Sequence, residues 1–215
     1  MIAPFLPQQR LLFIGDSITD CGRRTNSPPL GSGYVRRVAD GLAAALPEHS
    51  LTILNRGVSG DTTRDLLGRW QADVIDQAPD HLIIAIGIND VWRFMSRRFG
   101  EAVAVGEYEQ NLRHLLNKTA AALPACKLAL LEPFLVEANQ LDIFRRSLAP
   151  YQAVLRALAA QFQVPLVSLQ HAFDAAIAAG TPPQDLAGDR VHPSAAGHAL
   201  IAQTFLAACS LEQAT

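Results

Sequence analysis

Short runs of apolar residues alternate along this chain with longer stretches in which apolar residues recur at helical spacing. The apolar runs cover residues 11–14, 51–54, 82–86, 128–131 and 164–167, and each has the length of a buried strand. The helical stretches cover residues 35–46, 63–77, 107–123, 144–162 and 194–209. The alternation predicts five units of a strand followed by a helix.

The predicted strands are apolar at consecutive positions, so both of their faces are expected to be buried. Such strands belong to a parallel sheet with helices on each side, and the connections are long enough for right-handed crossovers. The pattern predicts a single domain over residues 1–215 with an α/β fold: a three-layer α/β/α sandwich around a five-stranded parallel sheet of flavodoxin-like order. Ligands of such sheets bind at the carboxyl ends of the strands, where the strand order switches direction.

The composition is typical of one globular domain, and the charge argues against certain classes of binding partner. A chain of 215 residues of which 49% are hydrophobic buries roughly 70% of the surface of its extended form. The 18 Lys and Arg residues against 20 Asp and Glu give a net charge of −2, and there is no long basic run. Neither nucleic acid nor a membrane surface is therefore expected as a partner.

The N-terminus and the cysteines indicate the compartment. The first ten residues contain two prolines and no basic region ahead of an apolar stretch, unlike a signal peptide. No segment approaches the roughly 20 apolar residues that span a bilayer. Cys21, Cys126 and Cys209 are odd in number and widely spaced, which indicates neither a disulfide framework nor a zinc site. A cytoplasmic protein with reduced thiols is expected.

Two segments far apart in the chain suggest hydrolytic chemistry. Ser17 follows the first predicted strand, and Asp189 and His192 lie three residues apart just before the last predicted helix. A serine hydroxyl attacks an ester only when a base removes its proton and a third group orients that base. The alternatives are a serine that caps a helix and a solvent-exposed histidine. Together the two segments favour a serine esterase.

Further groups at strand ends could stabilise the charge that develops during such a reaction. The backbone N–H of Ser17 and the side-chain amide of Asn89 are suitable donors to an oxyanion. Closely spaced glycines in residues 57–60 permit a tight approach of the backbone. Taken alone, each of these loops is equally an ordinary turn between a strand and a helix.

The other histidines and one cysteine are weaker candidates for catalytic residues. The remaining histidines are His49, His81, His114, His171 and His198, and none has a carboxylate at comparable range within a predicted site loop. Of these, His49, His81 and His171 lie at the boundaries of predicted elements and are expected to be exposed. Cys21, four residues from Ser17, is the alternative nucleophile.

Other classes of protein fit the sequence less well. Residues 57–61 lack the final glycine of an α/β-hydrolase nucleophile turn, and the first loop lacks the Gly-x-Gly-x-x-Gly of a dinucleotide enzyme. A flavodoxin-like FMN-binding module is the non-enzymatic alternative. A metal-dependent phosphoesterase would use Asp16, Asp20, Asp61 and His192 as ligands.

Four segments taken together match a known pattern. They are Gly15-Asp16-Ser17, residues 57–60, Gly87-Ile88-Asn89 and Asp189-Arg190-Val191-His192. In this order, and over nearly the whole chain, they resemble the sequence blocks of the SGNH hydrolase (GDSL esterase/lipase) superfamily. The resemblance implies the SGNH hydrolase fold with no metal and no cofactor. It also implies Ser17 as nucleophile, Gly60 and Asn89 as oxyanion donors, His192 as general base and Asp189 as the carboxylate that orients it.

More narrowly, residues 33–35 and 90–93 are similar to a branch of the superfamily that contains intracellular acetylxylan esterases. This similarity implies a serine esterase for short acyl groups, above all acetyl groups on carbohydrate such as xylo-oligosaccharides, acting through a covalent acyl-enzyme. Tyr34, Trp92 and Phe134 are expected to offer flat faces to a sugar.

One residue departs from that branch. An aromatic residue precedes the Asp-x-x-His segment there, whereas Gly188 stands here, so the pocket is expected to be more open. A lysophospholipase or thioesterase is the alternative activity. The expected partner is a small-molecule or oligosaccharide ester, and a homo-oligomer stays an open alternative.

Overall fold

Five parallel strands form one sheet in the computed structural model, which describes residues 1–25 and 29–210. The strands are β1 (Arg10–Gly15), β2 (Thr52–Gly57), β3 (His81–Ala85), β4 (Lys127–Leu131) and β5 (Leu166–Val167). Their order is β2-β1-β3-β4-β5, so the chain first moves to one side of β1 and then to the other. The predicted flavodoxin-like order is confirmed, and the switch point lies between β1 and β3.

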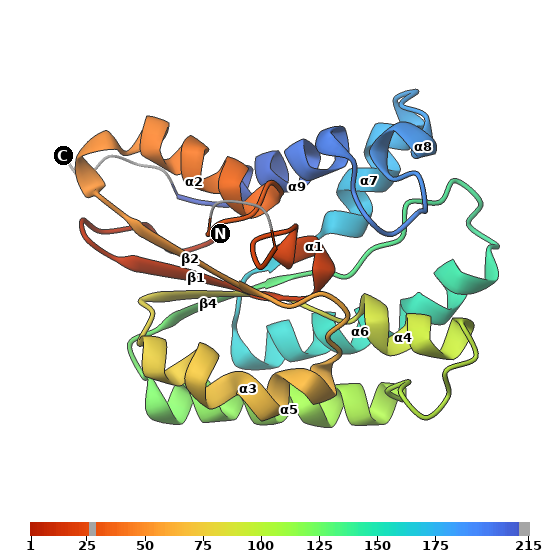
Figure 1. Cartoon of the computed structure of the whole chain (residues 1–215), viewed down its shortest axis with the longest axis horizontal. Coiled ribbons are helices and arrows are strands. Elements are labelled where there is room, and N and C mark those ends of the chain that lie inside the picture. Colours follow the sequence, from red (N-terminus) through yellow and green to blue (C-terminus); the bar gives the residue numbers. More distant parts are fainter. Residues whose placement is uncertain (26–28, 211–215) are drawn as a thin grey trace.

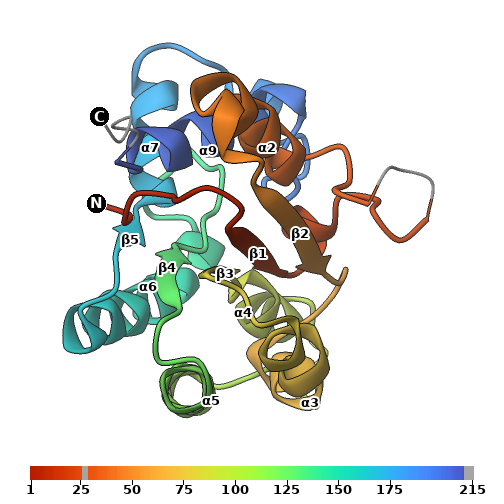
Figure 2. The same ribbon diagram turned by 90° about the vertical axis from the view of Figure 1, so that its left-hand side faces the viewer.

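Helices cover both faces of the sheet, as Figures 1 and 2 show. One face carries α2 (Tyr34–Ala45), α7 (Leu169–Ala178) and α9 (Ala195–Ala207), and the other carries α3 (Thr63–Asp73), α5 (Val105–Ala122) and α6 (Ile143–Phe162). The shorter elements are α1 (Ser17–Asp20), α4 (Ile88–Met95), α8 (Pro183–Leu186) and the 3-10 turns η1 (Pro47–His49) and η2 (Ile75–Gln77). This arrangement is the predicted three-layer α/β/α sandwich.

The core forms because the strands are apolar on both faces. Residues 11–14 of β1 are fully buried. Phe13 shows the packing on one side, where its ring lies 5.9 Å from that of Tyr34 in α2 and 5.5 Å from that of Phe205 in α9. Among the helices described by the structure, none has the length and apolar character needed to cross a membrane.

The sequence interpretation missed several helices and gave some elements a greater length than the structure shows. The helix expected over residues 63–77 ends at Asp73 and gives way to η2, and the strand expected over residues 164–167 contains only two residues. The sequence interpretation missed α4 because Gly87-Ile88-Asn89 resembles a turn, yet α4 begins at Ile88 directly after Gly87. It also missed α7, which follows β5 after a single residue.

Candidate active site

The first residue of α1 is Ser17, which lies at the carboxyl end of β1 and next to the switch point. Asp16 caps this short helix, because its side chain accepts a hydrogen bond of 3.0 Å from the Ile18 N–H. The cap fixes the backbone on both sides of Ser17. The serine hydroxyl is therefore presented by a defined turn.

Ser17, His192 and Asp189 form one hydrogen-bonded chain. Ser17 Oγ lies 3.0 Å from His192 Nε2, and His192 Nδ1 lies 2.6 Å from Asp189 Oδ2. In this geometry the carboxylate holds the proton on Nδ1 and leaves Nε2 to accept the serine proton. About half of the His192 side chain is exposed, so water can reach the imidazole.

A tight turn holds Asp189 and His192 together. Asp189 Oδ1 accepts hydrogen bonds from the backbone N–H groups of Val191 at 3.0 Å and His192 at 2.7 Å. Arg190, between them, has a positive φ of 73°, and its guanidinium pairs with Glu137 at 2.6 Å. Although partial burial acts in the opposite direction, the hydrogen bonds from His192 and Val191 hold the pKa of Asp189 below its usual value. The orienting group is thus a carboxylate at neutral pH.

The proposed oxyanion donors lie beside the triad of Ser17, His192 and Asp189. Asn89, in the first turn of α4, donates from Nδ2 to the Asp61 carbonyl at 3.0 Å, which fixes the amide and leaves its second hydrogen for a ligand. Gly60 has a φ of 90°, a conformation that favours glycine. Its carbonyl accepts a hydrogen bond of 2.9 Å from Arg93 Nη2.

These groups line one open hollow of about 400 Å³. Its walls are Ser17, Ser59, Gly60, Asn89, Trp92, Arg93 and His192. The ring of Trp92 lies 5.9 Å from that of His192 and 5.9 Å from that of Phe144 in α6. The structure therefore brings the predicted triad, both oxyanion candidates and Trp92 together in one place.

The structure does not support a sugar-binding face on Tyr34 or Phe134. Tyr34 is 1% exposed, and its hydroxyl forms a hydrogen bond of 3.0 Å with Thr19 Oγ1 in the core. Phe134 is 2% exposed and stacks on Phe173 with a centroid distance of 4.3 Å. Both side chains pack inward, so their burial corrects the expectation that they contact a substrate.

The burial of His81 contradicts the expectation that it is exposed, and His198 and Cys21 contact each other outside the hollow. His81 is buried rather than exposed, and its Nε2 lies 3.0 Å from Gln9 Oε1. His198 is buried as well. Its Nδ1 accepts the Tyr34 N–H at 3.2 Å, and its Nε2 lies 3.3 Å from Cys21 Sγ. Cys21 thus contacts α9 and is not among the residues that line the hollow with Ser17.

The carboxylates of the metal-dependent alternative have other partners. Asp61 Oδ2 accepts a hydrogen bond of 2.6 Å from Arg69 Nε, and Asp20 Oδ2 accepts bonds from the N–H and hydroxyl of Ser59 at 3.1 and 3.0 Å. In the part of the chain covered by the structure, no three side chains of His, Cys, Asp or Glu are grouped to hold a metal ion. These pairings do not support a phosphoesterase centre.

Two carboxyl groups near the site are buried. Burial, opposed by the hydrogen bond from the Ile18 N–H and aided by the neighbouring carboxylates Asp90 and Asp61, raises the pKa of Asp16 to about 7. Burial also raises the pKa of Asp90 to about 6, against the hydrogen bonds that Asp90 accepts from Thr63. Both groups therefore titrate close to neutral pH.

Sequence reasoning assigned no role to Ser59 or Arg93, which line the hollow. A signal for Arg93 is present in the sequence: Asn89, Trp92 and Arg93 are spaced i, i+3 and i+4, which places them on one side of a helix. That signal is informative only once residues 88–95 are recognised as helical.

Comparison with known proteins shows the family of the chain. The model of the GDSL-like Lipase/Acylhydrolase family matches residues 13–200, and the chain belongs to this family. It is a carboxylic ester hydrolase, so the FMN-binding alternative is not supported.

Individual relatives give more detail than the family match. The chain is 42% identical over 208 residues to an acetylxylan esterase of Geobacillus stearothermophilus, covering 92% of each sequence. It superposes on the crystal structure of Axe2, an acetylxylan esterase from that organism, with a TM-score of 0.90 at 40% identity over 98% of this chain and 99% of that one. An alpha/beta hydrolase enzyme from the metagenome of Lake Arreo matches with a TM-score of 0.88 at 40% identity, covering 95% and 96% of the two chains.

Proposed function

We propose that this protein is a serine esterase that removes acetyl groups from acetylated xylo-oligosaccharides. The observation that carries the proposal is the series of hydrogen bonds from Ser17 Oγ through His192 to Asp189. Ser17 and His192 line the same hollow as Asn89 and Gly60. One domain supplies every group of this reaction.

The geometry supports a two-step reaction. His192 Nε2 takes the proton of Ser17 as the hydroxyl oxygen attacks the ester carbonyl. The backbone N–H groups of Ser17 and Gly60 and the Asn89 amide stabilise the oxyanion, and Asp189 stabilises the imidazolium. His192 then protonates the departing sugar hydroxyl. Water, activated by the same imidazole, attacks the acetyl-enzyme and releases acetate and free Ser17.

The relatives support the same roles. Solved structures of Axe2 include catalytic mutants in which a serine, an aspartate or a histidine is replaced by alanine. The aspartate and the histidine are three residues apart in that enzyme, as Asp189 and His192 are here.

The shape of the site favours a short acyl group. Among the described residues that line the hollow, Trp92 is the one large apolar side chain, and the others are polar or glycine. An apolar cavity near Asp16 has a volume of only about 20 Å³, which is close to the space of a single water molecule. Within residues 1–25 and 29–210, the lining of the hollow thus offers little apolar wall to a fatty acyl chain, and this argues against a lysophospholipase or a long-chain thioesterase.

A substrate panel tests the proposal. We expect kcat/KM for p-nitrophenyl esters to be highest for acetate and to fall towards octanoate, and acetylated xylo-oligosaccharides to be hydrolysed efficiently. Ser17→Ala, with its fold checked by circular dichroism, should abolish both activities. A kcat/KM that rises with acyl length, together with inert acetylated sugars, would instead support the lysophospholipase or thioesterase alternative.

The proposed setting of the enzyme is the cytoplasm, with a small-molecule or oligosaccharide ester as its partner. Cell fractionation tests the location. Sedimentation of the purified protein tests whether it forms a homo-oligomer.

A further inference from the structure

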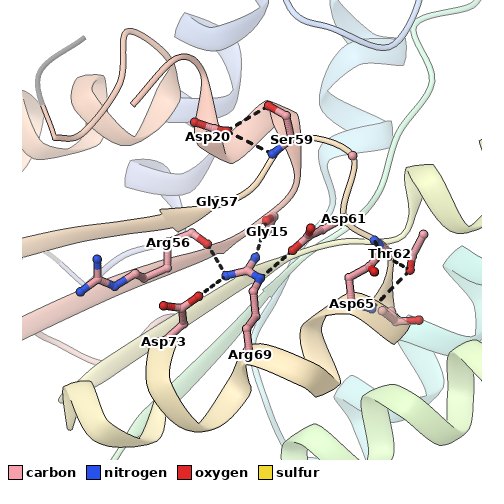
Figure 3. Close-up of polar contacts among 12 residues, drawn as sticks. Gly15, Asp20, Arg56, Gly57, Ser59, Asp61, Thr62, Asp65, Arg69 and Asp73 are labelled. Atoms are coloured by element: carbon pink, nitrogen blue, oxygen red, sulfur yellow. Dashed lines mark hydrogen bonds and ion pairs between the residues drawn. The ribbon is translucent and has the colours of Figure 1, made fainter. Parts of the chain in front are cut away.

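Residues 59–61, the oxyanion loop, are held by side chains from other parts of the chain. Asp20 of α1 accepts two hydrogen bonds from Ser59, as Figure 3 shows. Arg93 of α4 donates to the carbonyl of Gly60. Every residue of this loop is thus anchored, because Asp61 is bound as well, through both its carbonyl and its carboxylate.

Arg69 of α3 makes the contact with the Asp61 carboxylate, and it also reaches the nucleophile turn. Its Nε donates to Asp61 Oδ2 at 2.6 Å, and its Nη2 donates to the carbonyl of Gly15 at 3.0 Å. Its Nη1 donates to the carbonyl of Arg56 at 2.7 Å and to Asp73 Oδ2 at 2.8 Å. Figure 3 shows these contacts converging on one guanidinium. They use four of the five N–H donors of the arginine.

We propose that Arg69 is a positioning residue of the esterase, which sets the oxyanion loop at a fixed distance from the nucleophile. Gly15 lies two residues before Ser17, and Asp61 directly follows Gly60. One rigid planar group therefore bridges the backbone next to the attacking hydroxyl and the residue next to the oxyanion donor. Arg69 is not among the residues that line the hollow, so it acts through its neighbours.

Asp61 transmits the position of Arg69 to a second donor. Its carboxylate binds Arg69, while its carbonyl accepts the Asn89 amide at 3.0 Å. A shift of Asp61 therefore moves both the Gly60 peptide and the support of Asn89. Misplacement of reacting groups by about 1 Å can lower a rate by about 10², so a small relaxation here is expected to affect catalysis.

The chemistry of the contacts requires an arginine. The side chains of Arg69 and Asp61 are 17% and 11% exposed, so removing one partner leaves a mostly buried charge without compensation. Lysine would keep a positive charge near Asp61, but it cannot reproduce a planar fork directed at Gly15, Arg56 and Asp61 together. Arg64 on the same helix is a natural contrast, because it forms a half-exposed ion pair with Glu107.

The test measures p-nitrophenyl acetate hydrolysis by the full-length enzyme. We expect Arg69→Gln to lower kcat by about 10-fold to 100-fold with little change in KM, and Arg69→Lys to lie between it and wild type. The matched control Arg64→Gln should keep wild-type kcat. A wild-type kcat in Arg69→Gln, or equal losses in Arg69→Gln and Arg64→Gln, would overturn the proposal.

A double-mutant cycle separates positioning from a general loss of structure. If Arg69 acts through the oxyanion donors, the kcat loss of Arg69→Gln combined with Asn89→Ala should be smaller than the product of the two single losses. If the losses multiply, Arg69 does not act through Asn89 and the proposal fails. Should Arg69→Gln not fold, Arg69→Lys carries the same cycle.

The inference rests on the proposed function, and the two can fail separately. An active Ser17→Ala enzyme would contradict the proposed function itself. An inactive Ser17→Ala enzyme together with wild-type kcat in Arg69→Gln would contradict only the role of Arg69.

Discussion

Asn89 uses one of its two amide hydrogens to hold its own position. The bond from Nδ2 to the Asp61 carbonyl orients the side chain in the hollow beside Ser17. Because losing one oxyanion donor lowers kcat by about 10²–10³, we expect Asn89→Ala to reduce kcat for p-nitrophenyl acetate by that factor with little change in KM. Steady-state kinetics on the folded variant measures this. A wild-type kcat would reduce Asn89 to a turn residue.

Substitutions of Gly188 test whether a sugar contacts the turn before Asp189. A Cβ placed on Gly188 would meet no atom within 4 Å, so a side chain can leave the backbone without a clash. We expect Gly188→Trp to lower KM for acetylated xylo-oligosaccharides, because an added ring face contributes about 1 kcal/mol. The kcat/KM for p-nitrophenyl acetate should change little.

The control for that ring is Gly188→Ala, which adds a Cβ alone. The measurement is the ratio of kcat/KM for the sugar ester to that for p-nitrophenyl acetate in each variant. Equal ratios in the alanine and tryptophan variants would show that the sugar does not reach this turn.

At the scale of residues, the sequence was sufficient where chemistry and spacing are local. The spacing of Asp189 and His192 predicted their pairing, because a turn of this length brings a carboxylate to an imidazole. Tyr34, Phe134 and His81 could not be placed this way. Their burial depends on which side of each element faces the sheet, and tertiary packing decides that.

At the scale of elements, periodicity predicted the five strands and the long helices, but not the short helix α4. This helix begins in a segment that resembles a turn and contains only eight residues, too few for a clear apolar period. It nevertheless supplies Asn89, Trp92 and Arg93 to the hollow. Residues that the sequence interpretation treated as a loop thus form a helical wall of the site.

Contact between the end of β2 and α1 leads to a prediction at this scale. A Cβ on Gly57 would lie 2.2 Å from the backbone nitrogen of Asp20 in α1. Backbone atoms cannot move aside easily, so Gly57→Ala is expected to lower the free energy of unfolding by about 1–3 kcal/mol. We also expect a lower kcat, since α1 begins with Ser17.

Gly68→Ala is the matched control in α3, where a Cβ meets no atom within 4 Å. Alanine favours a helix more than glycine does, so this variant should gain up to about 1 kcal/mol with unchanged kcat. Urea unfolding of both variants measures the difference. A Gly57→Ala enzyme as stable as Gly68→Ala would show that α1 tolerates displacement from β2.

At the scale of the whole molecule, strand order explains why distant segments meet. Ser17 follows β1, Gly60 follows β2 and Asn89 follows β3, and these three strands are neighbours in the sheet. Parallel strands end on the same edge, so the predicted order was enough to predict that the segments converge. The role inferred for Arg69 could not be predicted, because it depends on distances set by side-chain packing.

A buried histidine and a buried aspartate are expected to make the stability of the whole molecule depend on pH. Burial lowers the pKa of His81 to about 4. Between this value and the unfolded value of 6.5, the unfolded chain binds a proton that the native protein does not, so stability falls as the pH is lowered. This effect amounts to roughly 3 kcal/mol. The free energy of unfolding of His81→Gln should therefore increase, compared with that of wild type, as the pH is lowered from neutral.

Asp16 is expected to give the opposite dependence. Burial raises its pKa from 3.8 to about 7, so the native protein holds a proton that the unfolded chain releases, and stability is lost as the pH rises through this range. Asn keeps an oxygen for the Ile18 N–H, so Asp16→Asn should gain stability relative to wild type as the pH rises from about 4 to about 7. Urea unfolding across this range measures both variants. Slopes of the same sign for Asp16→Asn and His81→Gln would contradict the assignment of a protonated Asp16 and a neutral His81 in the folded protein.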